Sequence, residues 1–266
     1  MNTQVKCRTT IQNKDHFYFQ SIQEYGIDYC YAQYIDIESD FLVIPDGCID
    51  LLFYCDEQKP QITYYGPMSK PQIQDLKSGY YFGVHFLPGE VPQIIDDQSI
   101  SVQKLLNHRL IIYGKEIKTE ISSMEEMILH TNIFKLQVAL FKTYYESIYT
   151  MPKKEDKKTS CIQSILQKIF QSNGTIRTNE LSEQLAYSEQ YINRIFKNQT
   201  GLTPKNYSSL VRFQKALTLL MEESSKIDLT DISMKSGYYD QSHMIKDFKK
   251  YTNQTPQAFI QTLRNA

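Results

Sequence analysis

Hydrophobic residues in the first third of the chain form short clusters that are separated by turn residues. Tyrosine, isoleucine and phenylalanine dominate the clusters, and pairs containing glycine, proline or serine divide them. Clusters of this length and composition are typical of antiparallel strands. We therefore predict an antiparallel sheet or small barrel, with strands at Tyr29–Ile37, Phe41–Ile44, Ile49–Tyr54, Ile62–Tyr65 and Tyr80–Phe86.

After Gly89 the hydrophobic residues recur every three to four positions. One stripe consists of Ile117, Ile121, Met124 and Ile128, and a second consists of Ile133, Leu136, Leu140, Tyr144 and Ile148. Polar residues 130–132 separate the two stripes. This period indicates amphipathic helices. Two antiparallel helices are predicted to pack against the sheet.

The C-terminal part of the chain contains an internal repeat. Residues 188–204 and 240–256 share phenylalanine, lysine, threonine and proline positions, and Phe248 follows Phe196 by 52 positions. An internal repeat indicates a structural unit that is used more than once. Two copies suggest a unit used twice and not a solenoid.

The first copy is predicted to form a helix-turn-helix unit. Thr178 is placed to cap a helix over residues 179–185, the chain turns at Ala186, and Ser188 is placed to cap a second helix. Helical spacing puts the hydrophobic residues of the second helix on one side, where they dock on the first helix. These residues are Ile192, Ile195 and Phe196.

The second copy has the same organisation. Gly237 occupies the turn, where a positive φ costs glycine little, and Asp240 is placed to cap the second helix. Met244 and Phe248 lie on the predicted buried side of that helix. Asn253 suits the left-handed conformation that commonly ends a helix.

A long helix is predicted between the two copies. Pro204–Glu222 shows helical periodicity, and Pro204 is well placed in the first turn. A helix of about 18 residues spans roughly 27 Å. This length is near the ~34 Å that separates successive major-groove faces of DNA. One chain is therefore predicted to contact two groove segments.

Each second helix carries long polar side chains opposite its hydrophobic stripe. Amide and guanidinium groups form paired hydrogen bonds with purine edges in a major groove, whereas contacts to phosphate provide affinity without sequence information. The candidates for base reading are Gln190, Asn193, Arg194, Gln241, Ser242 and Lys246. The candidates for phosphate contact are Lys197, Lys205, Arg212, Lys249 and Lys250. The predicted partner is double-stranded DNA.

Residues 159–264 resemble the DNA-binding domain of the AraC/XylS transcriptional regulators. The most specific matching string starts at Gly237 and reads G-Y-x-D-Q-S-H-x-x-x-x-F-K-x-x-x-x-x-T-P. The resemblance implies two helix-turn-helix units joined by a long helix, and activation of transcription through contact with RNA polymerase, with repression as the alternative. Ser182 and Ser233 stand where the family usually has a small alanine, and Asn253 stands where it commonly has a glycine. These differences imply slightly looser packing.

The N-terminal half has a second resemblance. IPDGCIDLLF, YYGPMS and GVHFLPG are similar to motifs in the β-rich N-terminal domain of a subset of AraC-type regulators, over roughly residues 10–150. This implies a sensing or dimerising domain and names no ligand. We expect an α+β chain with a β-rich domain ending in a helical pair at residues 1–150, a linker at 151–158 and an all-α DNA-binding domain at 159–266.

Charge divides the chain in the same way. Residues 1–150 contain 12 Lys and Arg against 19 Asp and Glu, and residues 151–266 contain 17 against 11. A basic half suits a polyanionic partner. The lysine-rich stretch at 151–160 is expected to be a solvated linker, with an arm that touches phosphate as the alternative. No apolar run is long enough to span a membrane and no signal-peptide core is present, so the protein is expected in the cytoplasm.

The N-terminal half offers little reactive chemistry. Its cysteines and histidines lack the spacing of metal or redox motifs, so no metal, cofactor or catalytic residue is predicted. Asp46 and Asp50 flank a turn, in which an Asx turn is the favoured role of Asp46. The alternative, an enzyme fused to a DNA-binding domain, would need a cysteine nucleophile. The candidates are Cys30, Cys48 and Cys55.

Aromatic residues leave two interpretations of the sheet open. The chain has 20 Tyr and no Trp. Tyrosine and phenylalanine either line a pocket for a small-molecule effector or pack the sheet. The candidates for ligand contact are Tyr64, Tyr65, Tyr80, Phe82 and His85. Control by homodimerisation, or by a protein partner that binds the stripe from Ile133 to Ile148, is the alternative.

Overall fold

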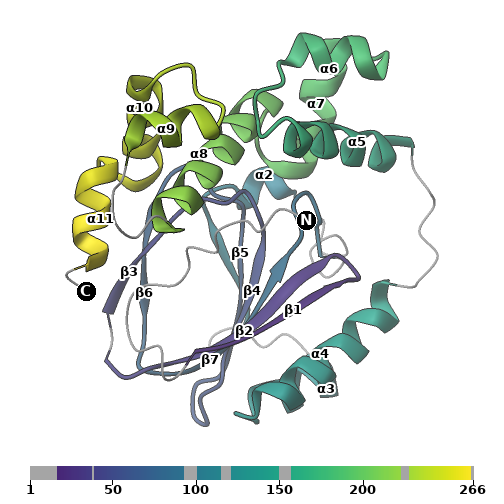
Figure 1. The fold of residues 1–266 in the computed structure, drawn as a ribbon. Coiled ribbons are helices and arrows are strands. Elements are labelled where there is room, and N and C mark those ends of the chain that lie inside the picture. The colour runs from purple at the N-terminus through teal and green to yellow at the C-terminus, as the bar shows by residue number, and fades with distance from the viewer. Residues whose placement is uncertain are drawn as a thin grey trace.

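The computed structural model describes residues 17–37, 39–92, 101–114, 121–149, 157–222 and 228–264. The N-terminal half is built on antiparallel strands, and the C-terminal helices gather at one end of these strands (Figure 1). This confirms the predicted α+β class.

Six strands form one antiparallel sheet in the order β1-β2-β7-β4-β5-β8, and two more form a separate antiparallel pair. The six are β1 (Phe17–Glu24), β2 (Ile27–Ile35), β7 (Gly79–Phe86), β4 (Asp50–Tyr54), β5 (Gln61–Tyr65) and β8 (Arg109–Tyr113). The pair is β3 (Ser39–Val43) and β6 (Gln72–Leu76). All five predicted strands are confirmed.

Three strands were not predicted from the sequence. β1 and β8 are the two edges of the large sheet, and β6 pairs only with β3 among the described strands. A strand with a neighbour on one side buries less surface, so β1 is exposed or half-buried throughout, and both β1 and β6 carry polar residues among their hydrophobic ones. The helical pattern predicted after Gly89 is wrong at β8, where the segment Arg109–Tyr113 pairs with β5.

Both faces of the large sheet are covered. Side chains alternate along a strand, and on β7 Phe82, Val84 and Phe86 belong to one core cluster whereas Tyr81 belongs to the other. Tyr31 of β2 lies in the same cluster as Tyr81. The central strands are therefore apolar on both sides.

Two helices cover the face that carries Phe82. These are α3 (Ser123–Leu129) and α4 (Phe134–Tyr149), and α4 lies beside β1 and β2, apart from the C-terminal helices (Figure 1). Ser122 caps α3 with a capping box. Its hydroxyl accepts from the Glu125 N–H, and the Glu125 carboxylate accepts from the Ser122 N–H. The predicted helical pair is confirmed.

The stripe predicted for α4 is confirmed in part, because Leu140 and Tyr144 are half-buried and pack against the core cluster. Ile133 is 60% exposed and Leu136 is 43% exposed, and the helix buries another set of residues. The buried residues are Gln137, Val138, Phe141 and Tyr145. Of the stripe predicted for the first helix, Ile117 lies outside the described residues.

Two contacts explain this orientation of α4. The Phe141 ring lies 6.1 Å from the ring of Phe53 and 6.4 Å from that of Phe82. The Gln137 amide donates to the carbonyls of Ile128 and Thr131. A buried amide is tolerated when its hydrogen bonds are made, so a polar residue lies on the buried side and hides the pattern from sequence analysis.

The C-terminal half consists of helices around one core cluster. They are α5 (Lys157–Gln171), α6 (Thr178–Leu185), α7 (Glu189–Thr200), α8 (Pro204–Glu222), α9 (Leu229–Lys235), α10 (Gln241–Thr252) and α11 (Pro256–Arg264). The α6–α7 and α9–α10 pairs both contact α8 (Figure 1). The two predicted helix-turn-helix units and the long helix between them are confirmed. The predicted linker residues Lys157 and Lys158 belong to α5.

Local signals set the ends of these helices. Ser188 and Asp240 accept hydrogen bonds from the first turns of α7 and α10, and Gly201 and Asn253 end these helices with φ of 76° and 61°. The predicted cap at Thr178 is wrong, because α6 begins at Thr178 itself.

Candidate nucleic-acid interface

Helix α7 presents a polar side to solvent. Gln190, Arg194 and Lys197 are exposed, whereas Asn193 is half-buried. The Asn193 amide donates to the Glu189 carbonyl at 2.9 Å, which orients it along the helix. The guanidinium of Arg194 lies 5.3 Å from the centre of the Tyr191 ring. A cation over an aromatic face is held by the ring quadrupole, so Arg194 is oriented by its own helix.

Helix α10 presents the equivalent side of the second unit. Ser242, Lys246, Lys249 and Lys250 are exposed, and Gln241 is half-buried. Hydrophobic residues on the opposite side, including Met244 and Phe248, are fully buried. The polar stripe is thus fixed in orientation by the core beneath it.

Arg212 differs from the other candidates for phosphate contact. Its guanidinium donates to the Gly174 carbonyl and lies 5.5 Å from the centre of the Tyr238 ring. Gly174 precedes the first unit and Tyr238 belongs to the second, so Arg212 on α8 connects the two. Lys205, at the start of α8, is exposed. The DNA contacts of these residues stay predictions.

A buried hydrogen-bond network joins α8 to the second unit. The Asp247 carboxylate accepts from the Ser209 hydroxyl at 2.9 Å and from the Tyr238 hydroxyl at 3.2 Å. The Tyr251 hydroxyl donates to Ser209 at 3.1 Å. Burial, with Asp247 nearby, raises the pKa of Tyr238 above its usual range, so the phenol keeps its proton and donates. The network was not predicted, although the position of Asp247 between Met244 and Phe248 was a signal.

The five candidates for ligand contact do not gather in one place. Tyr64 and Phe82 belong to the cluster beneath α3 and α4, where the Tyr80 hydroxyl reaches Gln137 at 3.0 Å. Tyr65 belongs to the opposite cluster. His85 is on that opposite side too, where its ring stacks on Tyr29 at 4.5 Å. The sheet separates the two groups.

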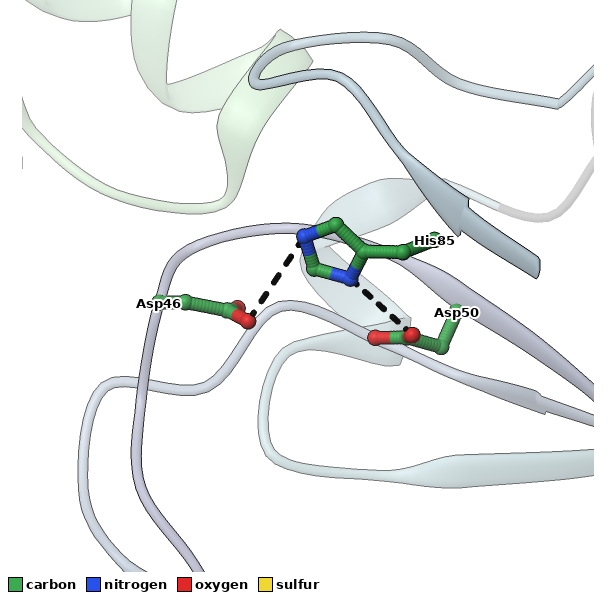
Figure 2. A group of neighbouring side chains, drawn as sticks. All are labelled: Asp46, Asp50 and His85. Atoms are coloured by element: carbon green, nitrogen blue, oxygen red, sulfur yellow. Dashed lines mark hydrogen bonds and ion pairs between the residues drawn. The ribbon is translucent and has the colours of Figure 1, made fainter. Parts of the chain in front are cut away.

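The structure brings Asp46, Asp50 and His85 together (Figure 2). The His85 Nδ1 lies 3.0 Å from an Asp50 oxygen, and the Nε2 lies 3.8 Å from Asp46. The Cys48 N–H donates to the Asp46 carboxylate at 2.9 Å, which confirms the predicted Asx turn. Spacing along the chain gives no sign of this group, because β4 and β7 pair only in the folded sheet.

These three side chains offer ligand atoms within 4.8 Å of one another, a separation that suits a metal ion. The His85 imidazole already interacts with both carboxylates, as Figure 2 shows. We infer that these three side chains stabilise the loop at residues 45–48.

That loop contacts the C-terminal half. Gly47 lies against the Tyr207 ring of α8, since a Cβ atom added to it would approach that ring to 2.8 Å. The Gln214 amide of α8 donates to the Pro45 carbonyl. Ile44 belongs to the C-terminal core cluster. Asp46 and Asp50 thus hold His85 directly beside the place where the sheet meets α8.

Two further contacts reach the first unit. The Gln199 amide of α7 donates to the Gly89 carbonyl at 3.1 Å. Gln103, on the short helix α2 (Val102–Leu105), donates to Asn198 of α7. These contacts from the N-terminal half fall on α7 of the first unit and on α8.

Burial makes Cys30 and Cys55 poor nucleophiles among the described cysteines. Cys30, Cys48, Cys55 and Cys161 are free thiols, and Cys7 lies outside the described residues. Burial raises the pKa of Cys55 to about 12 and that of Cys30 further. A thiol needs its thiolate form to act as a nucleophile.

The helices that the structure describes were compared with the length and hydropathy that a membrane span requires. None of them meets both requirements.

Two family models match separate parts of the chain. Residues 181–262 match a helix-turn-helix domain, and residues 23–110 match a domain of unknown function, DUF6597. The first covers both helix-turn-helix units, and the second covers most of the sheet.

Two relatives of this chain are named as regulators. It is 27% identical to the Msm operon regulatory protein of Streptococcus mutans over 149 residues, which are 55% of this chain and 52% of the relative. It is 33% identical to the transcriptional activator RhaS of Escherichia coli over 81 residues, 30% of this chain and 28% of RhaS. The chain thus spans about half the length of the Msm operon regulatory protein and less than a third of the length of RhaS.

A solved structure of ToxT from Vibrio cholerae aligns with most of the chain. The alignment covers 93% of this chain and 99% of ToxT, with 11% identity and a TM-score of 0.43.

Proposed function

We propose that this protein is a DNA-binding transcriptional regulator with an AraC-type helix-turn-helix domain in its C-terminal half. It reads two successive major-groove segments of one DNA duplex. The observation that carries the proposal is the equivalence of α7 and α10. Both are second helices of helix-turn-helix units, both pack on α8, and both expose a polar stripe. The second helix of such a unit enters the major groove.

The proposal divides the polar residues by role. Gln190, Asn193 and Arg194 read bases in one groove segment, and Gln241, Ser242 and Lys246 read bases in the next. The residues proposed to contact phosphate are Lys197, Lys205, Lys249 and Lys250. The position of Arg212 between Gly174 and Tyr238 supports a structural role for it in place of a phosphate contact.

We further propose that the protein activates transcription through contact with RNA polymerase and that its N-terminal half controls this activity. The naming of RhaS as an activator supports the first part. The contacts of residues 44–47, Gly89 and Gln103 with α7 and α8 support the second part. A small molecule that moves these loops would change the position of the first unit.

Selection of bound sequences from random duplex DNA tests the function directly. The full chain should enrich a motif with two blocks about one helical turn, ~34 Å, apart. Arg194→Ala should cost roughly 1–3 kcal/mol of binding and relax the preference at one base pair. Lys249→Ala should weaken all sequences about equally and lower the salt dependence by about one ion.

The two variants control for each other, because both remove an exposed cation from a recognition helix. Equal, sequence-independent losses for both would contradict the division into readers and phosphate contacts. Enrichment of no sequence by the unmodified chain would contradict the proposed function itself.

Control by a protein partner or a second copy is the alternative to a small molecule. Exposed hydrophobic side chains near the start of α4 favour it, since Met127, Ile133 and Leu136 are 51%, 60% and 43% exposed. If copies of this chain pair here, Ile133→Asp with Leu136→Asp should turn a dimer into a monomer in sedimentation equilibrium. Val138, which is buried in α4, is left unchanged in this variant so that the packing of the helix on the sheet is kept. A monomeric unmodified chain would exclude pairing of copies.

A further inference from the structure

Tyr239 has an unusual position for a large aromatic side chain. It is 94% exposed, against 52% for Tyr18, 48% for Tyr34 and 39% for Tyr187, the other exposed tyrosines. Exposure of a large ring on this scale gains nothing from the hydrophobic effect. Within the described part of the chain, no ring contact or side-chain hydrogen bond involves Tyr239.

The residue lies at the entrance of the second recognition helix. It follows Tyr238, which is buried, and precedes Asp240, whose carboxylate accepts from the His243 N–H and caps α10. Its side chain therefore starts from a backbone that is held on both sides. It stands two residues before Gln241 and three before Ser242, two of the proposed base readers.

The internal repeat provides a comparison. Tyr187 stands at the equivalent position of the first unit, directly before the cap Ser188. Its ring stacks on Tyr191 at 5.1 Å. The equivalent of Tyr191 in the second unit is His243, which instead packs edge-on against Tyr238 at 5.3 Å. The second unit thus lacks the neighbour on which the first tyrosine rests.

We propose that Tyr239 contacts the DNA backbone beside the second groove segment, with its hydroxyl donating a hydrogen bond to a phosphate oxygen. Tyrosine hydroxyls and the N-terminal ends of recognition helices are common sources of phosphate contacts. The contact rests on the proposed function, since it needs α10 to enter a groove. A neutral donor also suits this place, because the Asp240 carboxylate next to it would oppose a closer approach of phosphate.

Removal of the hydroxyl alone tests this contact. Tyr239→Phe in the full chain should weaken binding to the selected duplex about tenfold, the size expected when a hydrogen bond to a charged group is lost. The loss should be the same for every bound sequence. The salt dependence should stay unchanged, because the tyrosine neutralises no phosphate charge. Tyr34→Phe, on β2 of the sheet, removes an exposed hydroxyl elsewhere and should leave the affinity unchanged.

Tyrosine iodination gives a second measurement that does not depend on a variant. Tyr239 should react first in the free protein, because it is the most exposed, and the selected duplex should protect it while Tyr34 stays reactive. Unchanged affinity of Tyr239→Phe, or a loss confined to one base pair, would overturn the phosphate contact while the proposed function stands. Absence of any duplex binding by the unmodified chain would overturn both.

Discussion

Phe248→Ala should destabilise the C-terminal half by about 3–5 kcal/mol, the usual cost of removing a buried phenylalanine ring. Phe248 is fully buried, and its ring meets that of Phe213 on α8 edge-to-face at 5.1 Å. Phe248 lies in one buried cluster with Phe213 and Met244, so its removal leaves a cavity among closely packed side chains. A loss of this size is a large part of the 5–15 kcal/mol that typically stabilises a domain.

Urea unfolding of the full chain, followed by circular dichroism at the helix band, measures this loss. DNA affinity should fall in parallel, because the packing of Phe248 on α8 helps to orient α10. Met234→Ala is the matched control: this side chain is 63% exposed on α9, and its removal should change the free energy of unfolding by less than about 0.5 kcal/mol. A cost below about 1 kcal/mol for Phe248→Ala would show that α10 does not depend on this core.

Phe196→Ala offers an internal comparison. Phe196 holds the equivalent place in the first unit, is fully buried, and lies edge-to-face with Tyr207 at 5.4 Å. Tyr207 in turn contacts the loop that contains Gly47. The loss should therefore reach the contact with the sheet as well as the first unit.

Gly47→Ala should loosen the contact between the sheet and α8. Gly47 has φ of 76°, and the added Cβ would lie 2.8 Å from the Tyr207 ring and 3.1 Å from Leu210. The left-handed backbone costs a non-glycine residue about 1–2 kcal/mol, and overpacking typically adds about 1–3 kcal/mol. Both the ring and the aliphatic side chain belong to the C-terminal core, so neither can easily move aside.

Thermal unfolding of the full chain detects this change. The variant should melt earlier, and the two halves should unfold in more clearly separate transitions because the contact that couples them is weaker. Gly114→Ala is the control, since its backbone has no positive φ and the nearest side-chain atom, on Gln61, would be 3.5 Å away. An unchanged melting profile for Gly47→Ala would mean that the loop is not held against α8.

Where one helix or strand carries the information, the sequence predicted it well. The repeat at Phe196 and Phe248 predicted two helix-turn-helix units, because the spacing of a docked helix is a local property of the chain. Caps at Ser188 and Asp240 were equally visible. The central strands were found for the same reason, since burial on both faces makes them continuously apolar.

Predictions failed where a partner outside the segment decides the outcome. The face of α4 was assigned from Ile133 and Leu136, yet Gln137 is buried because the carbonyls of Ile128 and Thr131 accept its amide protons. Edge strand β8 carries a short hydrophobic run, Leu110 to Tyr113, which alone does not distinguish a strand from a helix, and its pairing with β5 decided the outcome. The ligand candidates Tyr64 and Tyr65 are neighbours along the chain, but a strand sends them to opposite faces.

The sequence by itself determined the two recognition helices, their exposed polar stripes and the basic character of the half that contains them, because these features depend on side-chain type and spacing. Only the tertiary structure decided that the 45–48 loop meets α8, that His85 lies between Asp46 and Asp50, and that Tyr239 is left without the stacking partner of Tyr187. The first two depend on atoms brought together from distant parts of the chain, and the third on the ring of His243, which packs against Tyr238. Hydrophobic burial is not directional, so the residue pattern shows that a segment is buried and leaves its partner to the fold.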